Sequence, residues 1–144
     1  MNKLLILIFA AFIACTNTDT AQQENKENKD QHKDSAKAIQ LNNGVKYKAD
    51  SVTKKHVAEM LQVITDTAYN GAGKAMPLAA ALQSKADALV KDCTMQGTEH
   101  EALHTWLKEL LKGIKELKED EKDEYTKVHQ ELKQHLASFY NYFE

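Results

Sequence analysis

Residues 98–117, TEHEALHTWLKELLKGIKEL, carry the clearest structural signal in this chain. Apolar side chains recur there at intervals of three or four residues, at Leu103, Leu107, Leu110, Leu111, Ile114 and Leu117. Thr98 and Glu101 have the spacing of a capping box, in which each side chain satisfies a free backbone donor of the other residue. The pattern predicts an amphipathic helix that begins at Thr98 and ends in the charged segment 118–123. Trp106 borders the apolar stripe and is expected to pack against it.

Three further stretches show helical periodicity. One begins at Asp50 or Ser51 and stops at the glycine-containing breaker 70–73, one runs from near Met76 to Gly97, and one follows Asp123. Their apolar positions, taken in order, are Val57, Met60, Leu61, Ile64 and Ala68, then Leu78, Leu82, Ala86, Leu89 and Cys93, then Tyr125, Val128, Leu132, Leu136, Phe139 and Phe143.

Residues 51–144 are therefore predicted to form an all-α domain. Short connections force consecutive helices to reverse direction, which favours an antiparallel up-down-up-down four-helix bundle. Residues 39–50 precede it as a short extended lead-in with a turn signal at Asn43-Gly44.

The N-terminus has the three-part layout of a secretory signal. Lys3 precedes an unbroken apolar run from Leu4 to Ala14, which is too short to span a bilayer, since a spanning helix needs about 20 residues. Residues 12–15, Phe-Ile-Ala-Cys, resemble a lipobox, although Phe12 stands where leucine is usual. We expect residues 1–14 to be a lipoprotein signal peptide and Cys15 to be lipidated, for example with palmitate. The alternative is an ordinary secreted protein cut near Ala14.

Residues 15–38 have the composition of a flexible, disordered tether, because almost no apolar side chains are available to offset the entropy of ordering. The chain is accordingly expected in the cell envelope, attached to the outer membrane through the lipid on Cys15. The tether lacks an acidic run directly after Cys15, which favours the periplasmic side over surface export.

The overall charge excludes one large class of partner. The formal net charge is −2, and −3 once Lys3 is removed, and acidic and basic residues are interspersed. A nucleic-acid-binding surface is not expected from this distribution. Another envelope protein is a partner that the sequence leaves open.

Chemically notable side chains gather around the predicted connection between the second and third helices. His100 and His104 are four residues apart, so they share one helix face. They also extend the apolar stripe backwards by seven residues from Leu107 and Leu111, so both rings are expected to point inward. In the predicted bundle the end that carries them also carries His56, Cys93, Met95 and His135.

These residues predict a soft-metal site. Once Cys15 is lipidated, Cys93 is the only remaining thiol. Two imidazoles with a thiolate and a thioether, from Cys93, Met95, His100 and His104, form a nitrogen and sulfur set that favours copper, with zinc as a competitor. His56 and His135 are possible additional ligands.

Two alternatives remain open at this point. The first is a structural or protein-interaction lipoprotein whose histidines are hydrogen-bonded or exposed. The second, and least favoured, is a b-type haem held by Met60 and His135; covalent c-type haem is excluded because no Cys-x-x-Cys-His motif occurs. An enzyme is not expected, because the chain has no nucleophile elbow, phosphate loop or glycine-rich nucleotide motif.

Two segments, 42–47 (Asn-Asn-Gly-Val-Lys-Tyr) and 93–107 (Cys-Thr-Met through His-Thr-Trp-Leu), resemble a family of small, mostly uncharacterised envelope lipoproteins of Bacteroidetes-type bacteria. The resemblance covers most of the mature domain and implies a helical domain in the envelope. It implies no established activity, so the metal prediction rests on the residues themselves.

Overall fold

A computed structural model describes residues 38–119 and 124–144 of the chain. It contains four α-helices: α1 (Ser51–Thr65), α2 (Ala75–Asp92), α3 (Gly97–Glu119) and α4 (Tyr125–Tyr142). Two short 3₁₀ helices, η1 (Thr67–Tyr69) and η2 (Ala72–Lys74), connect α1 to α2. The predicted signal peptide 1–14, the lipidation site Cys15 and residues 15–37 of the tether lie outside the described residues.

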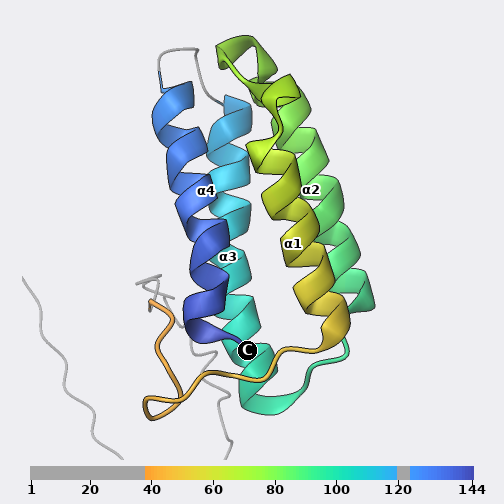
Figure 1. The fold of residues 1–144 in the computed structure, drawn as a ribbon, viewed down its shortest axis with the longest axis vertical. Helices are drawn as coiled ribbons and strands as arrows, with labels where there is room; N and C mark the ends of the chain where they lie inside the picture. The colour runs from red at the N-terminus through yellow and green to blue at the C-terminus, as the bar shows by residue number, and fades with distance from the viewer. Residues whose placement is uncertain (1–37, 120–123) are drawn as a thin grey trace, which may run out of the picture. The chain divides into compact units, whose positions relative to one another are not determined.

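The four helices form a bundle, so the predicted all-α class and four-helix bundle are confirmed. Each helix packs against the next along the chain, and α4 packs back onto α1. The start of α1, the connection between α2 and α3 and the end of α4 all lie at one end of the bundle (Figure 1).

The core is built from one face of each helix, with Trp106 of α3 fully buried inside it. The Trp106 ring meets Phe139 of α4 edge to face at a centroid distance of 5.2 Å, and Phe139 stacks on Phe143 at 4.5 Å. The sequence predicts that Trp106 packs at the border of the stripe, and in the structure it is one of the largest side chains enclosed by the bundle. Burying an aromatic of this size is among the largest single contributions to a small core.

A glycine lets α3 and α4 approach each other closely. Gly113 lies inside α3, and a Cβ atom added there would come within 2.7 Å of Leu132 Cδ2 on α4. Glycine inside a helix costs about 1 kcal/mol relative to alanine, and an alanine at this position would require the end of the Leu132 side chain to shift.

The lead-in is extended and is fastened to the end of α4. Asn43 and Gly44 both have positive φ, 52° and 83°, which is the requirement of a tight hairpin-type turn. Beyond that turn, the Tyr47 amide donates to the Tyr142 carbonyl at 2.8 Å, and the Glu144 amide donates to the Tyr47 carbonyl at 3.0 Å. The two chain segments are thus joined by a short parallel bridge.

Asp50 joins the start of α1 to the α2–α3 connection. One carboxylate oxygen caps α1 by accepting from the Thr53 amide at 2.6 Å. The other accepts from both the amide (2.9 Å) and the hydroxyl (2.6 Å) of Thr94. Burial raises the pKa of the Asp50 carboxyl. The hydrogen bonds from Thr94 and Thr53 lower this pKa by more than burial raises it, so the pKa lies well below the ordinary value.

Two helix ends differ from the prediction, and in each case the helix ends early. α1 ends at Thr65, because the next residue, Asp66, has an extended backbone. The Asp66 side chain instead caps η1 by accepting from the Ala68 amide. Ala68, which was expected on the apolar face of the first helix, is exposed. α2 ends at Asp92 rather than at Gly97. Cys93, the next residue, is extended, and Asp50 accepts hydrogen bonds from the amide and the hydroxyl of Thr94.

The predicted capping box at the start of α3 was wrong. The helix begins at Gly97, one residue before Thr98. The Thr98 hydroxyl then donates to the Glu99 carboxylate at 3.0 Å. Gly97 has a φ of 61°, which favours glycine and allows the chain to turn directly into the helix.

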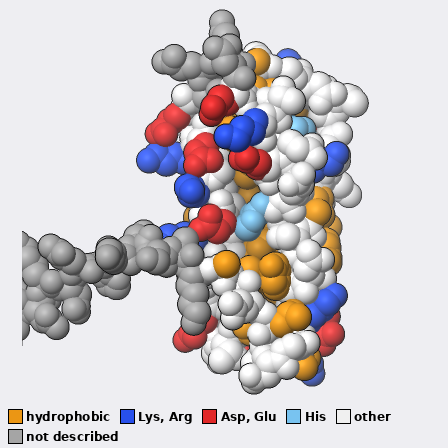
Figure 2. Space-filling model, turned by 90° about the vertical axis from the view of Figure 1, so that its left-hand side faces the viewer, with side chains coloured by type: hydrophobic (Ala, Val, Ile, Leu, Met, Phe, Trp, Pro, Cys, Tyr) orange, Lys and Arg blue, Asp and Glu red, His pale blue; other side chains and the backbone are white. Residues whose placement is uncertain are grey.

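The surface carries mixed charge. On the face in Figure 2, acidic and basic side chains intermingle in the upper part, and hydrophobic side chains gather in the lower part. Within the described ranges, no helix has both the length and the hydropathy to cross a bilayer.

Replacing Asp50 by alanine removes the acceptor of three hydrogen bonds. Loss of a helix cap alone typically costs about 1 kcal/mol, so we expect at least this decrease in the free energy of unfolding, measured by urea denaturation near neutral pH. Asp66→Ala is the matched control, because Asp66 caps only the short and exposed η1. Equal stabilities of the two variants would contradict the role given to Asp50.

The stabilisation by Asp50 should depend on pH in one direction. A carboxyl whose pKa is lowered by folding stabilises fully above its unfolded pKa of about 3.9, and loses that contribution as the pH falls below it. The difference in unfolding free energy between the wild type and Asp50→Ala should therefore shrink between about pH 6 and pH 3. A difference that stays constant over this range would be inconsistent with a charged acceptor.

Candidate metal centre

Cys93 lies directly after α2 and contacts the first turn of α3. It is a free, half-buried thiol that packs against the edge of the core. Its neighbour Thr94 is bound by Asp50 of the α1 cap, which holds this connection in place. The Cys93 sulfur lies 3.8 Å from Nδ1 of His100, within the range of a hydrogen bond to sulfur.

His100 and His104 form a close pair on α3. Their Nε2 atoms are 2.9 Å apart, and their ring centroids are 4.4 Å apart. The spacing of four residues on a helix produces this contact, as the sequence predicted. Cys93, His100 and His104 thus form a continuous row of three donor side chains.

The expectation that both rings point inward was wrong. His100 is half-buried and His104 is exposed. The expectation for His104 came from stepping back seven residues from Leu111, which is itself only half-buried. A straight helix also drifts by about 20° per heptad, so a residue seven positions from the edge of a stripe leaves it.

The two contacts of His100 constrain where its proton lies. If Nδ1 carries the proton, it donates to the Cys93 sulfur and leaves Nε2 with a free lone pair. If Nε2 carries the proton, it donates to His104, and the Cys93 thiol donates to Nδ1. A metal ion on the two Nε2 atoms requires the first arrangement, in which Cys93 orients the His100 ring as a hydrogen-bond acceptor.

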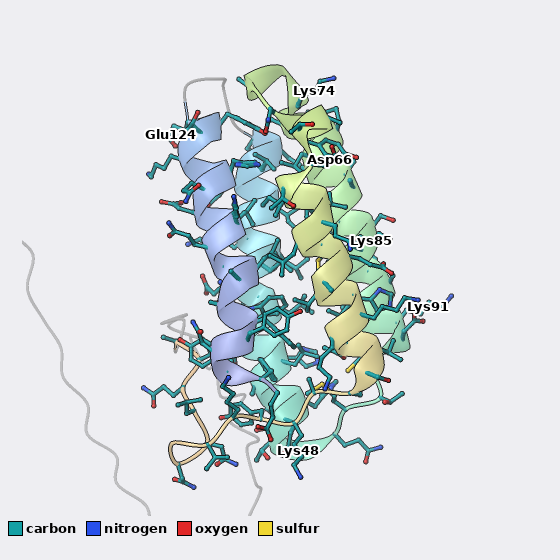
Figure 3. The ribbon with its side chains drawn as sticks, in the orientation of Figure 1. Lys48, Asp66, Lys74, Lys85, Lys91 and Glu124 are labelled. Atoms are coloured by element: carbon teal, nitrogen blue, oxygen red, sulfur yellow. The ribbon has the colours of Figure 1, made fainter. Side chains whose placement is uncertain are left out.

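His56 is buried but belongs to a different cluster. Its Nε2 lies 3.0 Å from Oδ2 of Asp92, and its Nδ1 is buried without a hydrogen-bond partner among the described residues. Glu59, one turn further along α1, accepts from Lys85 of α2 at 2.8 Å, and this hydrogen bond lowers the pKa of Glu59. Lys85 and Lys91 lie along α2 in Figure 3. These polar contacts link α1 to α2.

His135 forms a reciprocal contact with Trp106. Its Nε2 donates to the Trp106 carbonyl at 2.9 Å, and the Trp106 indole N–H donates to the His135 carbonyl at 3.3 Å. The two rings also stack at 5.2 Å. Burial lowers the pKa of His135, although the bond to Trp106 and the Glu109 carboxylate oppose the effect. A metal or haem ligand at His135 would have to give up the bond to Trp106 or use the other nitrogen.

The two methionines considered as ligands lie in the core. Met95 is buried and belongs to the hydrophobic cluster, and Met60 of α1 is fully buried in the same cluster. Met60 is therefore a packing residue of α1, as its place in the apolar stripe suggests.

The six residues that were expected to gather at one site thus belong to different sets of contacts. Contacts at hydrogen-bond range join Cys93 to His100 and His100 to His104, whereas His56 and His135 make such contacts with Asp92 and with the Trp106 carbonyl. In the part of the chain that the structure describes, no three side chains of His, Cys, Asp or Glu are arranged to hold one metal ion. The row instead offers two adjacent donor pairs that share His100.

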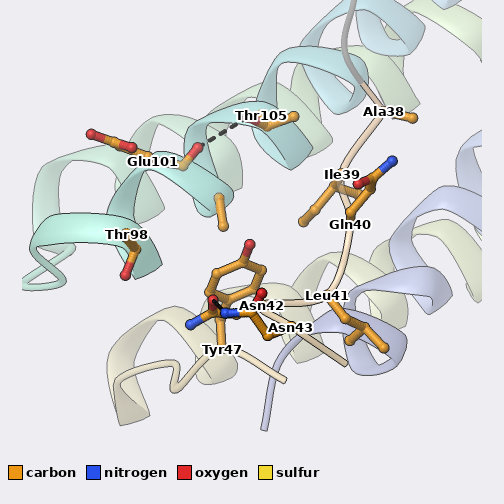
Figure 4. Close-up of a pocket in the computed structure, with 11 residues that line it drawn as sticks. Ala38, Ile39, Gln40, Leu41, Asn42, Asn43, Tyr47, Thr98, Glu101 and Thr105 are labelled. Carbon is orange, nitrogen blue, oxygen red and sulfur yellow. Dashed lines mark hydrogen bonds between the residues drawn. The ribbon is translucent and has the colours of Figure 1, made fainter. Parts of the chain in front are cut away.

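A separate hollow lies between the lead-in and α3 (Figure 4). Its volume is about 350 Å³, and its lining includes Ile39, Tyr47, Thr98, Glu101 and Thr105. Figure 4 places the lead-in from Ala38 to Leu41 on one side and Thr98, Glu101 and Thr105 on the other. Neither Cys93 nor the two histidines contributes to it.

No protein-family model, curated protein or solved structure matches this chain. The resemblance to envelope lipoproteins therefore stays a prediction from the sequence.

Two residues that position the row were not identified as such from the sequence. Asp50 was expected only as a helix cap, and its contact with Thr94 joins residues 44 positions apart. Thr94 follows Cys93 directly, but a threonine in a connection has no local pattern that marks it as bound. Asp92 likewise gives no sign that it will pair with His56.

The contact between His135 and Trp106 predicts a pH-dependent stability. Because burial lowers the pKa of His135, the unfolded chain takes up the proton first, near its ordinary pKa of about 6.5. Stability is then full above this pH and is lost as the pH falls below it. His135→Gln keeps an N–H donor for the Trp106 carbonyl but does not titrate. We expect the wild type to lose more unfolding free energy than this variant between about pH 7.5 and pH 5, and equal losses would contradict the assignment.

Proposed function

We propose that this chain is an envelope lipoprotein that binds a soft transition metal ion, copper in preference to zinc, through His100 and His104. In this proposal, Cys15 carries the lipid that attaches the chain to the outer membrane, residues 16–38 are the tether, and an antiparallel up-down-up-down bundle presents the metal site to the periplasm. The membrane part rests on the sequence pattern of residues 1–15.

The observation that carries the metal proposal is the 2.9 Å separation of the two Nε2 atoms. Two nitrogens that bind one tetrahedral ion at about 2.0 Å lie about 3.3 Å apart. The rings need to separate by only a few tenths of an ångström to admit the ion. His104 is exposed, so an ion has direct access from solvent.

Cys93 is assigned a positioning role toward His100. Ligand histidines commonly donate their second ring N–H to an acceptor, which fixes the ring and its tautomer. The sulfur at 3.8 Å from Nδ1 is in place for this. Met95, His56 and His135, which the sequence also suggested as ligands, have no part in the proposed site, because Met95 lies in the core and both histidines bond elsewhere.

The nature of the donors favours copper. Imidazole nitrogen binds copper, zinc and nickel, and affinity for a given nitrogen site is highest for copper. Calcium and magnesium prefer oxygen ligands and are not expected at this pair. The histidine pair supports binding of the ion. Storage, sensing and transfer of the ion are the roles that such binding would serve.

The proposal is tested by metal titration of the full-length protein in detergent, with Cu²⁺ and Zn²⁺ in competition with a chromophoric chelator. We expect the double variant His100→Gln, His104→Gln to lose binding. Cys93→Ser is expected to weaken binding by about tenfold, as is usual when a residue that orients a ligand is changed.

His129→Gln is the matched control. His129 Nε2 contacts the Ile64 carbonyl of α1 at 3.0 Å, and glutamine keeps an N–H donor for that carbonyl. This variant should bind metal like the wild type. Equal binding by the wild type and the His100, His104 double variant would refute the proposed site.

A further inference from the structure

The donors available in one chain leave the coordination of the ion incomplete. His100 faces Cys93 with one nitrogen and His104 with the other. A third ligand from Cys93 would therefore lie on the wrong side of the His100 ring for an ion held between the two Nε2 atoms. Among the described residues, no three side chains of His, Cys, Asp or Glu are arranged to hold one ion, whereas zinc and copper sites usually have four ligands.

A groove continues along α3 from the exposed histidine. It has a volume of about 470 Å³ and is lined by His104, Thr105, Leu107, Lys108 and Leu111. Leu107 and Leu111 follow His104 by three and seven residues, so all three lie along one side of the helix. Leu107 belongs to the core and Leu111 is half-buried, so a surface that covers His104 would also cover Leu111.

We infer that the metal ion is held between two copies of this chain, with His100 and His104 of each copy supplying four imidazole nitrogens. This inference rests on the proposed metal binding. In a twofold dimer the same patch of each copy faces its counterpart. The histidine pairs then meet at the axis, and the grooves with Leu107 and Leu111 pack beside them.

The dimer also suits two chains on one membrane. Tethering both copies to the same membrane raises their effective concentration relative to each other, so a small contact area is enough for dimerisation. Four nitrogens around one ion match the tetrahedral preference of zinc and the nitrogen sites of copper(II). The metal ion would then act as the main link in the interface.

The inference is tested on the full-length protein in detergent by native mass spectrometry with Cu²⁺ or Zn²⁺. We expect one ion per two chains, and single chains after addition of a chelator. The spectrum of bound Cu²⁺ in electron paramagnetic resonance should show four nitrogen ligands. One ion per single chain with two nitrogens, lost in the His100, His104 double variant, would overturn the dimer and leave the proposed function standing.

A groove variant provides a second measurement. Leu111→Lys places a charge in the apolar groove beside the site, and we expect the chain concentration needed for dimerisation to rise by at least about tenfold. Val90→Lys is the matched control, since Val90 is an exposed apolar residue of α2 outside the groove. Equal effects of the two variants would count against the inferred interface. Absence of any metal binding by the wild type would instead refute the proposed function itself.

Discussion

The bundle depends at one end on a single carboxylate. Asp50 caps α1 with one oxygen and holds Thr94 with the other, so the first helix and the connection between the second and third helices are fixed to the same group. Burial alone would favour the neutral acid, and the three donors around it outweigh that cost. Because Cys93 precedes Thr94, the same contact decides where the thiol lies relative to His100.

The positions of the helices and the Asp50 cap of α1 follow from local patterns, but the end of α2 and the start of α3 do not. The periodicity around Leu107 and Leu110 identifies α3, because a helix must bury an apolar face whatever its neighbours are. The end of α2 is different, since Thr94, just beyond it, is bound by an aspartate 44 residues earlier in the chain. The start of α3 was misplaced for a related reason: Gly97 with positive φ turns the chain into the helix before Thr98 can act as a cap.

In the candidate site, too, local contacts could be predicted from the sequence, and contacts between helices could not. The contact between His100 and His104 is local to one helix and was predicted from their spacing. The exposure of His104 depends on how α3 is rotated in the bundle, which the spacing alone does not determine. His56 and His135 were assigned to the site from their place in the topology, but the partners they find, Asp92 and the Trp106 carbonyl, come from other helices.

The burial of Trp106 has a practical consequence. It is the only tryptophan of the chain, and it is enclosed between α3 and α4 with His135 stacked on one side and Phe139 at its edge. Its emission spectrum therefore reports on this one helix contact, without interference from a second indole. The molecule contains an optical probe of its own packing, placed in the core rather than on the exposed surface that carries His104.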